Sequence, residues 1–515
     1  MNAQPKPRRR LRAPLVAALA LAAVAAHAPI GAQPQAQGPR STLPALGGGD
    51  GAMTTAAERK LGERIARELF RDPDYIDDPV VAEYVQKIWQ PLLAAARTRG
   101  ELTGELDDRY AWRVLLGKDR EINAFAVPGG WLGLHMGLIA VTQTQDELAS
   151  VLAHELSHVT QRHISRMIEA EGKATPLAIG AMILGAIAAS KNPQAGAALI
   201  TGGSALGTQL QLNFSRDMER EADRIGYGVL TQAGFEPQGF VTMFDKLYQA
   251  SRHNDSGAFP YLRTHPLTTE RISEMQARQQ LAPRTAAPTP TLEHAMVAAR
   301  ARVIANPGVD ALRANLTEPE GGNFATQARW RQAAALYAGA FAASKLHDTA
   351  TASKLLAQLK PVVAGDAAAT RLARLLAAEA ALTAGDPRTT IAIADVRNPE
   401  RPELMLLAEA RLAAGQAADA VPLLQTWVAS HPKDGTAWQV LGRAYSSQGQ
   451  QLRAIRADAE AQVAQLDYQA ALDRLRAAQD LVRKGGPGAD YIEASIIDTR
   501  ARQVQSLLRE QALER

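Results

Sequence analysis

Residues of the same kind recur every 34 positions in the C-terminal part of the chain. From about position 325 the composition is rich in Ala, Leu, Gln and Arg and shows no strand pattern. A fixed period of this length indicates helix pairs that stack on one another, because one pair alone cannot bury its apolar face. We therefore predict an all-helical solenoid over residues 326–515. The registered pairs are Leu404 and Trp438, Leu407 and Leu441, Ala408 and Gly442, Gly415 and Gly449, and Ala420 and Ala454.

One of these units matches a known repeat. Trp438, Leu441, Gly442 and Tyr445 fit the tetratricopeptide pattern W-x2-L-G-x2-Y, and Pro432 stands where that pattern closes the preceding repeat. Stacked helix pairs of this kind curve around a concave groove that suits an extended peptide. An ordinary helical bundle is the alternative.

The N-terminal segment has the layout of a secretory signal peptide. Basic residues lie between positions 6 and 12, an apolar run follows at 14–26, and Ala28 and Ala32 offer cleavage points. The apolar run is shorter than the roughly 20 residues that span a bilayer. We expect residues 1–32 to direct export to a bacterial periplasm, where the mature chain is soluble and has at most peripheral membrane contact.

A second apolar segment runs from Leu177 to Leu206 and is interrupted by the residues 191–193. Each half is too short to span a bilayer. We expect a buried or pocket-lining helical hairpin, and the alternative is a segment that touches a membrane surface or gates a cleft.

Charge and cysteine content exclude several classes of protein. The chain of 515 residues has 57 basic and 53 acidic residues, and the leader alone holds five of the basic ones and no acidic one. Without the leader the formal charge is 52 − 53 = −1, which gives no support for nucleic-acid binding. The absence of cysteine excludes disulfides, thiol nucleophiles, cysteine-ligated metals and a lipid-anchoring cysteine.

The region between the leader and the repeats mixes helices and strands. Apolar residues spaced three and four apart between positions 55 and 92 predict amphipathic helices. Thr144 and Glu147 form a capping box that opens a further helix. A compact three-stranded sheet is predicted from apolar or alternating segments at 110–116, 122–127 and 131–135.

The helix that begins after Thr144 carries the motif H-E-x-x-H, formed by His154, Glu155 and His158. Histidines four residues apart lie on one face of a helix, so both imidazoles can hold one zinc ion. The adjacent Glu155 then reaches the open side of the metal as a general base. His163 follows His158 by five residues, and we expect it to be a polar surface or packing residue.

Zinc needs a third protein ligand, and the acidic run from Glu219 to Asp223 offers candidates on another helix. Glu219 and Asp223 are four apart and share a face. We expect Glu219 to bind zinc and Asp223 to hydrogen-bond the far nitrogen of a ligating histidine. Glu221 is rotated by about 200° from Glu219 and should point away.

Four motifs together resemble a known family. These are Asn123-Ala-Phe-Ala-Val-Pro-Gly-Gly, the H-E-x-x-H motif, Ser215-Arg followed by Glu219 to Asp223, and Thr264-His-Pro with Arg271. In order and spacing they are similar to the zinc peptidases that include the HtpX heat-shock proteases and the CaaX prenyl endopeptidases. With a signal peptide and tetratricopeptide repeats, the chain most resembles the periplasmic β-barrel assembly-enhancing proteases.

The resemblance implies an α+β gluzincin peptidase domain, mostly helical with a small β-sheet, followed by the repeat solenoid. It makes His154, His158 and Glu219 the ligands of one Zn²⁺ per chain and Glu155 the base. The expected layout is a signal peptide at 1–32, a flexible linker at 33–54, the peptidase domain at 55–282, a linker with a helix at 283–325 and the repeats at 326–515.

Three supporting positions follow. Asn123, Ala124, Phe125 and Ala126 should form an edge strand that pairs with an extended substrate, with a plain structural strand as the alternative. His265 could stabilise the oxyanion that forms when water attacks a peptide carbonyl, or it could bind zinc as a fourth ligand and silence the enzyme. Arg271 could pair with Asp223 or with the oxyanion, or lie on a helix surface.

We therefore expect a periplasmic zinc metalloendopeptidase that degrades misfolded or stalled proteins during outer-membrane protein assembly. Its repeats would bind the polypeptide substrate or the assembly machinery. The alternative is mainly a tetratricopeptide chaperone or adaptor for outer-membrane assembly with a latent peptidase. A membrane-inserted prenyl-type peptidase is disfavoured by the short apolar runs.

Overall fold

The computed structural model describes residues 53–171, 185, 215–252, 261–281, 289–397, 399–484 and 490–512. The expected signal peptide and, apart from residue 185, the second apolar segment lie outside these residues. Within the described part of the chain, none of the helices combines the length and the apolar character needed to cross a membrane.

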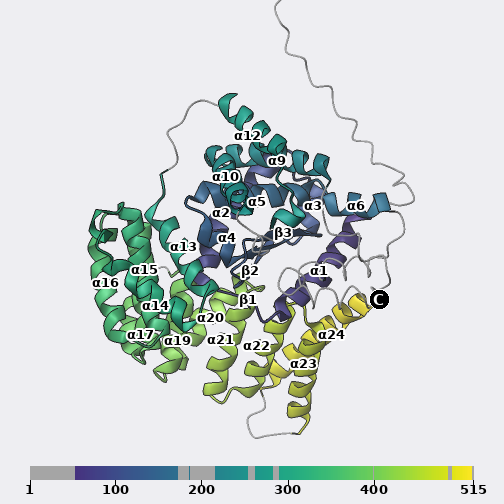
Figure 1. Ribbon diagram of the computed structural model, residues 1–515. Helices are drawn as coiled ribbons and strands as arrows, with labels where there is room; N and C mark the ends of the chain where they lie inside the picture. Colours follow the sequence, from purple (N-terminus) through teal and green to yellow (C-terminus); the bar gives the residue numbers. More distant parts are fainter. Residues whose placement is uncertain are drawn as a thin grey trace, which may run out of the picture. The chain divides into compact units, whose positions relative to one another are not determined.

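The N-terminal half of the described chain is mostly helical, with one small sheet (Figure 1). Its elements are α1 (Thr55–Arg71), β1 (Tyr75–Ile76), α2 (Pro79–Thr98), α3 (Gly104–Arg109), β2 (Arg113–Gly117), β3 (Ala124–Val127), β4 (Trp131–His135), α4 (Met136–Val141), α5 (Gln145–Thr160), α6 (His163–Glu171), α9 (Arg216–Gln232), α10 (Gln238–Arg252), α11 (Tyr261–Thr264) and α12 (Thr269–Leu281).

The sheet has four strands in the order β1-β2-β4-β3, so the expectation of three strands was wrong. The additional strand β1 has only two residues, which is too short for a visible alternation, and it pairs antiparallel with β2. Strand β2 runs parallel to β4, and β3 and β4 form an antiparallel hairpin. Gly129 and Gly130 in the hairpin turn have φ values of 74° and 83°, which only glycine adopts readily.

Helix α5 is buried along its length and packs against β3, α9 and α10. Its expected N-cap is present, because the Thr144 hydroxyl accepts a hydrogen bond from the Glu147 N–H. Helix α9 crosses α5 at Gly226, where an added Cβ would lie 3.1 Å from the Ala153 carbonyl oxygen and 3.2 Å from the His154 Cα. The missing side chain therefore lets the two backbones approach closely at His154.

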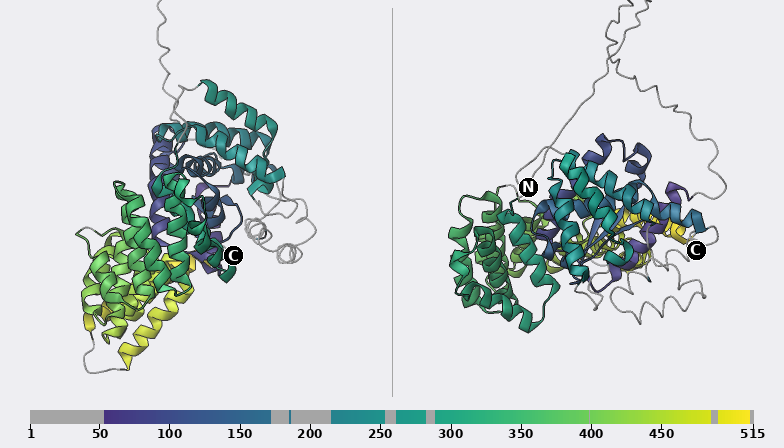
Figure 2. Two further views of the ribbon diagram at one scale, coloured as in Figure 1. Left: turned by 60° about the vertical axis from the view of Figure 1, so that its left-hand side comes forward. Right: turned by 45° about the horizontal axis from the view of Figure 1, so that its top comes forward.

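The C-terminal half is entirely helical in the described residues, and its helices follow one another in sequence order as antiparallel pairs (Figures 1 and 2). Its elements are α13 (Leu292–Ala305), α14 (Val309–Thr317), the 3-10 turns η1 (Glu318–Glu320) and η2 (Phe324–Thr326), α15 (Arg329–Lys345), α16 (Thr349–Val363), α17 (Ala367–Thr383), α18 (Pro387–Ala394), α19 (Arg401–Ala413), α20 (Ala417–Ser430), α21 (Gly435–Ser447), α22 (Gln451–Ala464), α23 (Tyr468–Arg483) and α24 (Tyr491–Ala512).

The 34-residue period appears directly in this arrangement. Helices α19 and α21 begin 34 residues apart, and so do α20 and α22. The turns inside both pairs contain a glycine with positive φ, Gly415 at 73° and Gly449 at 71°. Leu441 and Tyr445 of the repeat motif are buried in the core that α19 to α22 share. The side chains of the motif thus hold successive helix pairs together.

The described part of the segment between the two halves contains helices α13 and α14. Helix α13 packs against α4 on one side and α15 on the other. His294 on α13 contacts the Tyr84 hydroxyl at 2.7 Å and the Thr142 carbonyl oxygen at 3.1 Å. Most of α13 is buried, and its apolar residues belong to a core that continues from α2 and α5 into α15 and α17.

Arginines of the helical repeats also contact acids of the N-terminal half. Arg401 holds Asp77 at 2.9 Å and Asp434 at 2.7 Å. Arg371 lies between Glu83 and Glu403. Because these arginines bind an acid from each half, they fix the repeats against the loop before α2 and its first turns.

Gly226→Val is predicted to unfold more easily, because the branched side chain has to push α9 away from α5. We expect a loss of roughly 1–3 kcal/mol in the free energy of unfolding, measured from urea denaturation. Gly104→Val on α3 is the control, because an added Cβ there meets no atom within 4 Å. Equal losses in both variants would contradict the close packing of α9 on α5.

Arg401→Ala is predicted to leave two partly buried carboxylates without their guanidinium. We expect a loss of about 1.5–3 kcal/mol in unfolding free energy, the range for hydrogen bonds to charged groups. Arg476→Ala removes an exposed arginine whose nearest acid is 4.0 Å away, and it should change stability little. If the two variants lost the same amount of unfolding free energy in urea denaturation, the Arg401 contacts would not stabilise the packing of the two halves.

Candidate metal centre

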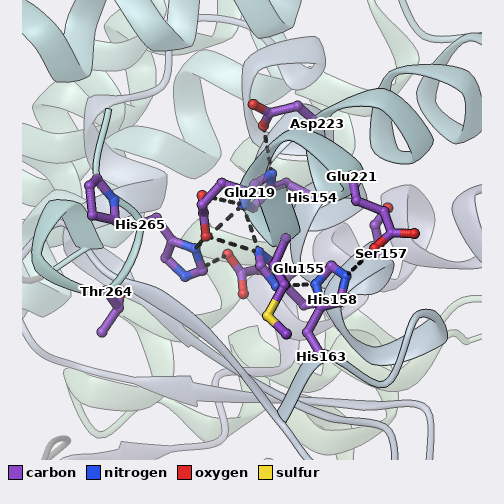
Figure 3. A network of polar contacts seen from close by, with 12 residues as sticks. His154, Glu155, Ser157, His158, His163, Glu219, Glu221, Asp223, Thr264 and His265 are labelled. Atoms are coloured by element: carbon purple, nitrogen blue, oxygen red, sulfur yellow. Dashed lines mark hydrogen bonds and ion pairs between the residues drawn. The ribbon is translucent and has the colours of Figure 1, made fainter. Parts of the chain in front are cut away.

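The two histidines of the motif meet at the buried face of α5. His154 and His158 are each 1% exposed. Their Nε2 atoms lie 3.0 Å apart. The spacing of four residues on a continuous helix places both rings side by side, as Figure 3 shows.

Two further side chains reach the same point from other elements. Glu219, in the first turn of α9, lies 3.4 Å from His158 Nε2 and 3.5 Å from His154 Nε2 through its two carboxylate oxygens. His265 follows α11, and its Nδ1 lies 3.4 Å from His154 Nε2 and 3.0 Å from Glu219 Oε1. All four side chains are buried, and their ligand atoms lie within 4.8 Å of one another.

These distances match the donor shell of a tetrahedral zinc ion. Zinc bonds of 2.0–2.1 Å to nitrogen and oxygen place neighbouring donors roughly 3.4 Å apart. Five separations among the four side chains run from 3.0 to 3.5 Å, with His154 paired to Glu219 Oε2 and the other two histidines to Oε1. Three imidazoles and one carboxylate are also ligand types that zinc accepts. The residues therefore fit a metal ion of this kind.

Asp223 and Arg271 surround the donor set on the α9 side. Asp223 Oδ1 lies 2.9 Å from His154 Nδ1, which is the nitrogen that faces away from the other donors. Arg271 binds the Asp223 carboxylate at 2.7 and 2.8 Å and Glu219 Oε2 at 2.7 Å. Burial raises the pKa of Asp223, but the charge and hydrogen bonds of Arg271 outweigh it and hold that pKa below its usual value.

Glu155 is fully buried beside the donor set. Its Oε1 lies 3.4 Å from Nε2 of His265. Burial raises the pKa of Glu155 above that of a free glutamate, although the nearby histidines oppose this shift. The ring of Tyr261 stacks on His265 with centroids 4.6 Å apart. His265 is thus held between Tyr261, Glu155 and Glu219.

Of the two roles expected for His163, a polar surface residue or a packing residue, the structure shows the buried one. It is 0% exposed, and its Nδ1 lies 2.9 Å from His158 Nδ1. Its Nε2 lies 3.1 Å from Glu221 Oε2 (Figure 3). Glu221 does point away from the four donors, as its position on α9 predicts, but it contacts this neighbouring histidine.

The predicted edge strand corresponds to β3, which begins at Ala124 and pairs with β4 at one end of the sheet. Asn123 accepts a hydrogen bond from the His135 N–H through its carbonyl oxygen. Because antiparallel bonding alternates, Phe125 also faces β4, whereas Ala124 and Ala126 direct their backbone groups away from it. Ala124 and Ala126 are buried, and Phe125 is half-buried. Helix α5 packs against this strand.

Comparisons with known proteins cover the region of the chain that contains these residues. The family model described as peptidase family M48 matches residues 82–279, which contain all the residues of the site. A second model, described as a bacterial transcriptional activator domain, matches residues 380–461 in the helical repeats.

Several curated relatives carry one name. The β-barrel assembly-enhancing protease of Yersinia pestis is 30% identical over 93% of this chain and 95% of its own length. That of Escherichia coli K12 is 29% identical over 97% of both chains. A Vibrio cholerae protein given the same name provisionally is 35% identical over 59% of this chain, and the chain spans only 58% of its length.

The peptidase model covers the site, and the Yersinia pestis relative aligns along nearly its whole length. On these two findings the chain is a peptidase of family M48, a family of metallopeptidases, and belongs with the β-barrel assembly-enhancing proteases.

Proposed function

We propose that the chain is a zinc endopeptidase whose metal is held by His154, His158 and Glu219 and is capped at rest by His265. The observation that carries this proposal is the convergence of four buried ligand side chains, whose ligand atoms lie within 4.8 Å of one another. A zinc ion bound there would polarise a peptide carbonyl and make water a better nucleophile at neutral pH.

Glu155 is the proposed general base. Its carboxylate lies next to the donor set, where it can take a proton from the attacking water and pass it to the leaving amine. Its raised pKa makes the carboxylate more basic than that of a free glutamate. Asp223 and Arg271 are proposed to position His154 and Glu219, since they bind the sides of those groups that face away from the metal position.

His265 is proposed to close the site in the resting state. Its Nδ1 occupies the fourth donor position and its Nε2 lies near Glu155, so one side chain blocks both the open metal position and the base. Movement of the segment after α11 would release both at once. In the alternative role, His265 donates a hydrogen bond to the oxyanion of the substrate instead.

Strand β3 is the proposed substrate-binding element. The backbone groups of Ala124 and Ala126 face away from β4 and can pair with an extended peptide beside α5. Both residues are buried in the described structure. Their burial agrees with a closed resting state at the same site as the His265 contact.

The relatives and the leader support the proposed compartment and partners. Relatives named for β-barrel assembly support a role in quality control of outer-membrane proteins, acting on misfolded or stalled polypeptides. The leader at 1–32 supports export to the periplasm. We keep 55–282 as the peptidase domain and 326–515 as the repeats, joined by 283–325.

The repeats are the proposed docking region for substrate or assembly partners. A cavity of about 600 Å³ lies between them and strand β2, with Arg113, Trp427 and Lys433 among its lining residues. The contact of His265 with the donor set also supports the second function considered, an adaptor whose peptidase is silent until a partner opens it.

Glu155→Gln is predicted to lose about 10²- to 10⁴-fold in cleavage rate, because an amide cannot act as the base. The measurement is cleavage of casein by the mature chain, with a chelator-treated sample and the exposed Glu169→Gln variant alongside. Glu169→Gln should retain activity and chelation should abolish it. Undiminished cleavage by Glu155→Gln would contradict the assigned base.

His265→Ala is predicted to raise casein cleavage by about tenfold or more, since a cap that costs ~1.4 kcal/mol to displace slows turnover tenfold. His347→Asn, at an exposed histidine of the repeats that does not line the cavity beside strand β2, should leave the rate unchanged. Zinc should stay bound in His265→Ala through the other three ligands. Loss of activity with zinc retained would instead assign His265 to the oxyanion.

A further inference from the structure

His158, the second histidine of the motif, contacts a series of side chains that the proposed mechanism does not use. His158 Nδ1 lies 2.9 Å from His163 Nδ1, and His163 Nε2 lies 3.1 Å from Glu221 Oε2. Arg166 binds the same Glu221 oxygen at 2.7 Å. Figure 3 shows the linked contacts of His158, His163 and Glu221 to one side of the other ligand residues.

With a metal ion on His158 Nε2, the distances indicate where the protons of this series lie. His158 Nε2 faces the other donor atoms, so its proton belongs on Nδ1 when Nε2 binds a metal. Two Nδ1 atoms 2.9 Å apart share one proton in a hydrogen bond. His163 Nδ1 must therefore accept from His158, and the single proton of His163 lies on Nε2, from which it donates to Glu221.

The backbone places His163 in this position. Arg162, between α5 and α6, has a φ of 54°, which ends the first helix and turns the chain before His163. His163 is fully buried, whereas the Glu221 side chain is 29% exposed. Glu221 at the end of the series is thus partly exposed to solvent and paired with Arg166. His163, in the middle of the series, lies against His158.

The two histidines of the motif are consequently oriented in different ways. His154 contacts a carboxylate directly, at Asp223. On its Nδ1 side, His158 is linked to Glu221 through a second imidazole. Both carboxylates come from α9, so one helix supplies Glu219 to the donor set and supports both histidine rings.

We propose that His163 is a positioning residue for His158, and that Glu221 sets its tautomer so that the His158 ring presents Nε2 to the metal. This inference rests on the proposed function, in which His158 is a zinc ligand. Groups that support a ligating histidine typically contribute 10- to 100-fold in metal affinity.

The test measures the zinc affinity of the purified mature chain by competition with a chromophoric chelator at fixed pH. His163→Leu should bind zinc 10- to 100-fold more weakly than the wild type. His163→Asn should recover part of that loss, because its side-chain oxygen can still accept from His158. Glu221→Ala should also weaken binding. The control Asp217→Asn removes a charge from a 94% exposed side chain on the same helix and should change nothing.

The controls separate the two claims. If His154→Ala bound zinc as tightly as the wild type, the proposed metal site itself would be wrong. If His154→Ala lost zinc while a folded His163→Leu kept wild-type affinity, only the positioning role would be overturned. Circular dichroism of each variant establishes that it is folded before its affinity is compared.

A second measurement needs no substitution. Long-range ¹H–¹⁵N NMR correlations of the zinc-loaded mature chain report which nitrogen of each histidine carries the proton. We expect His163, assigned with the His163→Asn variant, to be protonated on Nε2 alone. A proton on its Nδ1 would overturn the proposal, because two N–H groups would then face each other.

Discussion

The close contact between α5 and α9 is the interaction on which the site depends. At Gly226 the absence of a side chain lets α9 approach the backbone of α5 beside His154. That approach brings Glu219 to the two histidines of the motif and Asp223 to the far side of one ring. A helix held one side chain further away would leave the histidines without a carboxylate partner.

The same contact buries two carboxylates, and Arg271 compensates their negative charge. Burying carboxylates and imidazoles together is costly unless opposite charges and hydrogen bonds compensate. Arg271 is 4% exposed and binds both Asp223 and Glu219. Its own pKa stays high because these acids outweigh the effect of burial. A metal ion bound here would replace the protons between the histidines and carboxylates. Its positive charge would then balance the buried carboxylates.

Much of the fold and of the site could be predicted from the sequence, because the residue spacings that define them lie on continuous helices. The repeat period and the shared face of Glu219 and Asp223 both follow from regular helix geometry. His163 could not be predicted in this way. Five residues along an unbroken helix would turn it about 140° from His158, and only the left-handed residue Arg162 brings it back. Strand β1 was not predicted, because its two residues are too few to show a periodicity.

The central claim is that His154, His158, Glu219 and His265 surround one zinc ion in the resting protein. X-ray absorption at the zinc edge of the resting full-length mature chain tests it most directly. We predict one tightly bound zinc ion with four nitrogen or oxygen donors at about 2.0–2.1 Å. The spectrum should also contain the scattering of three imidazole rings. A spectrum with only two imidazoles and additional water, or a chain that binds no zinc, would contradict it.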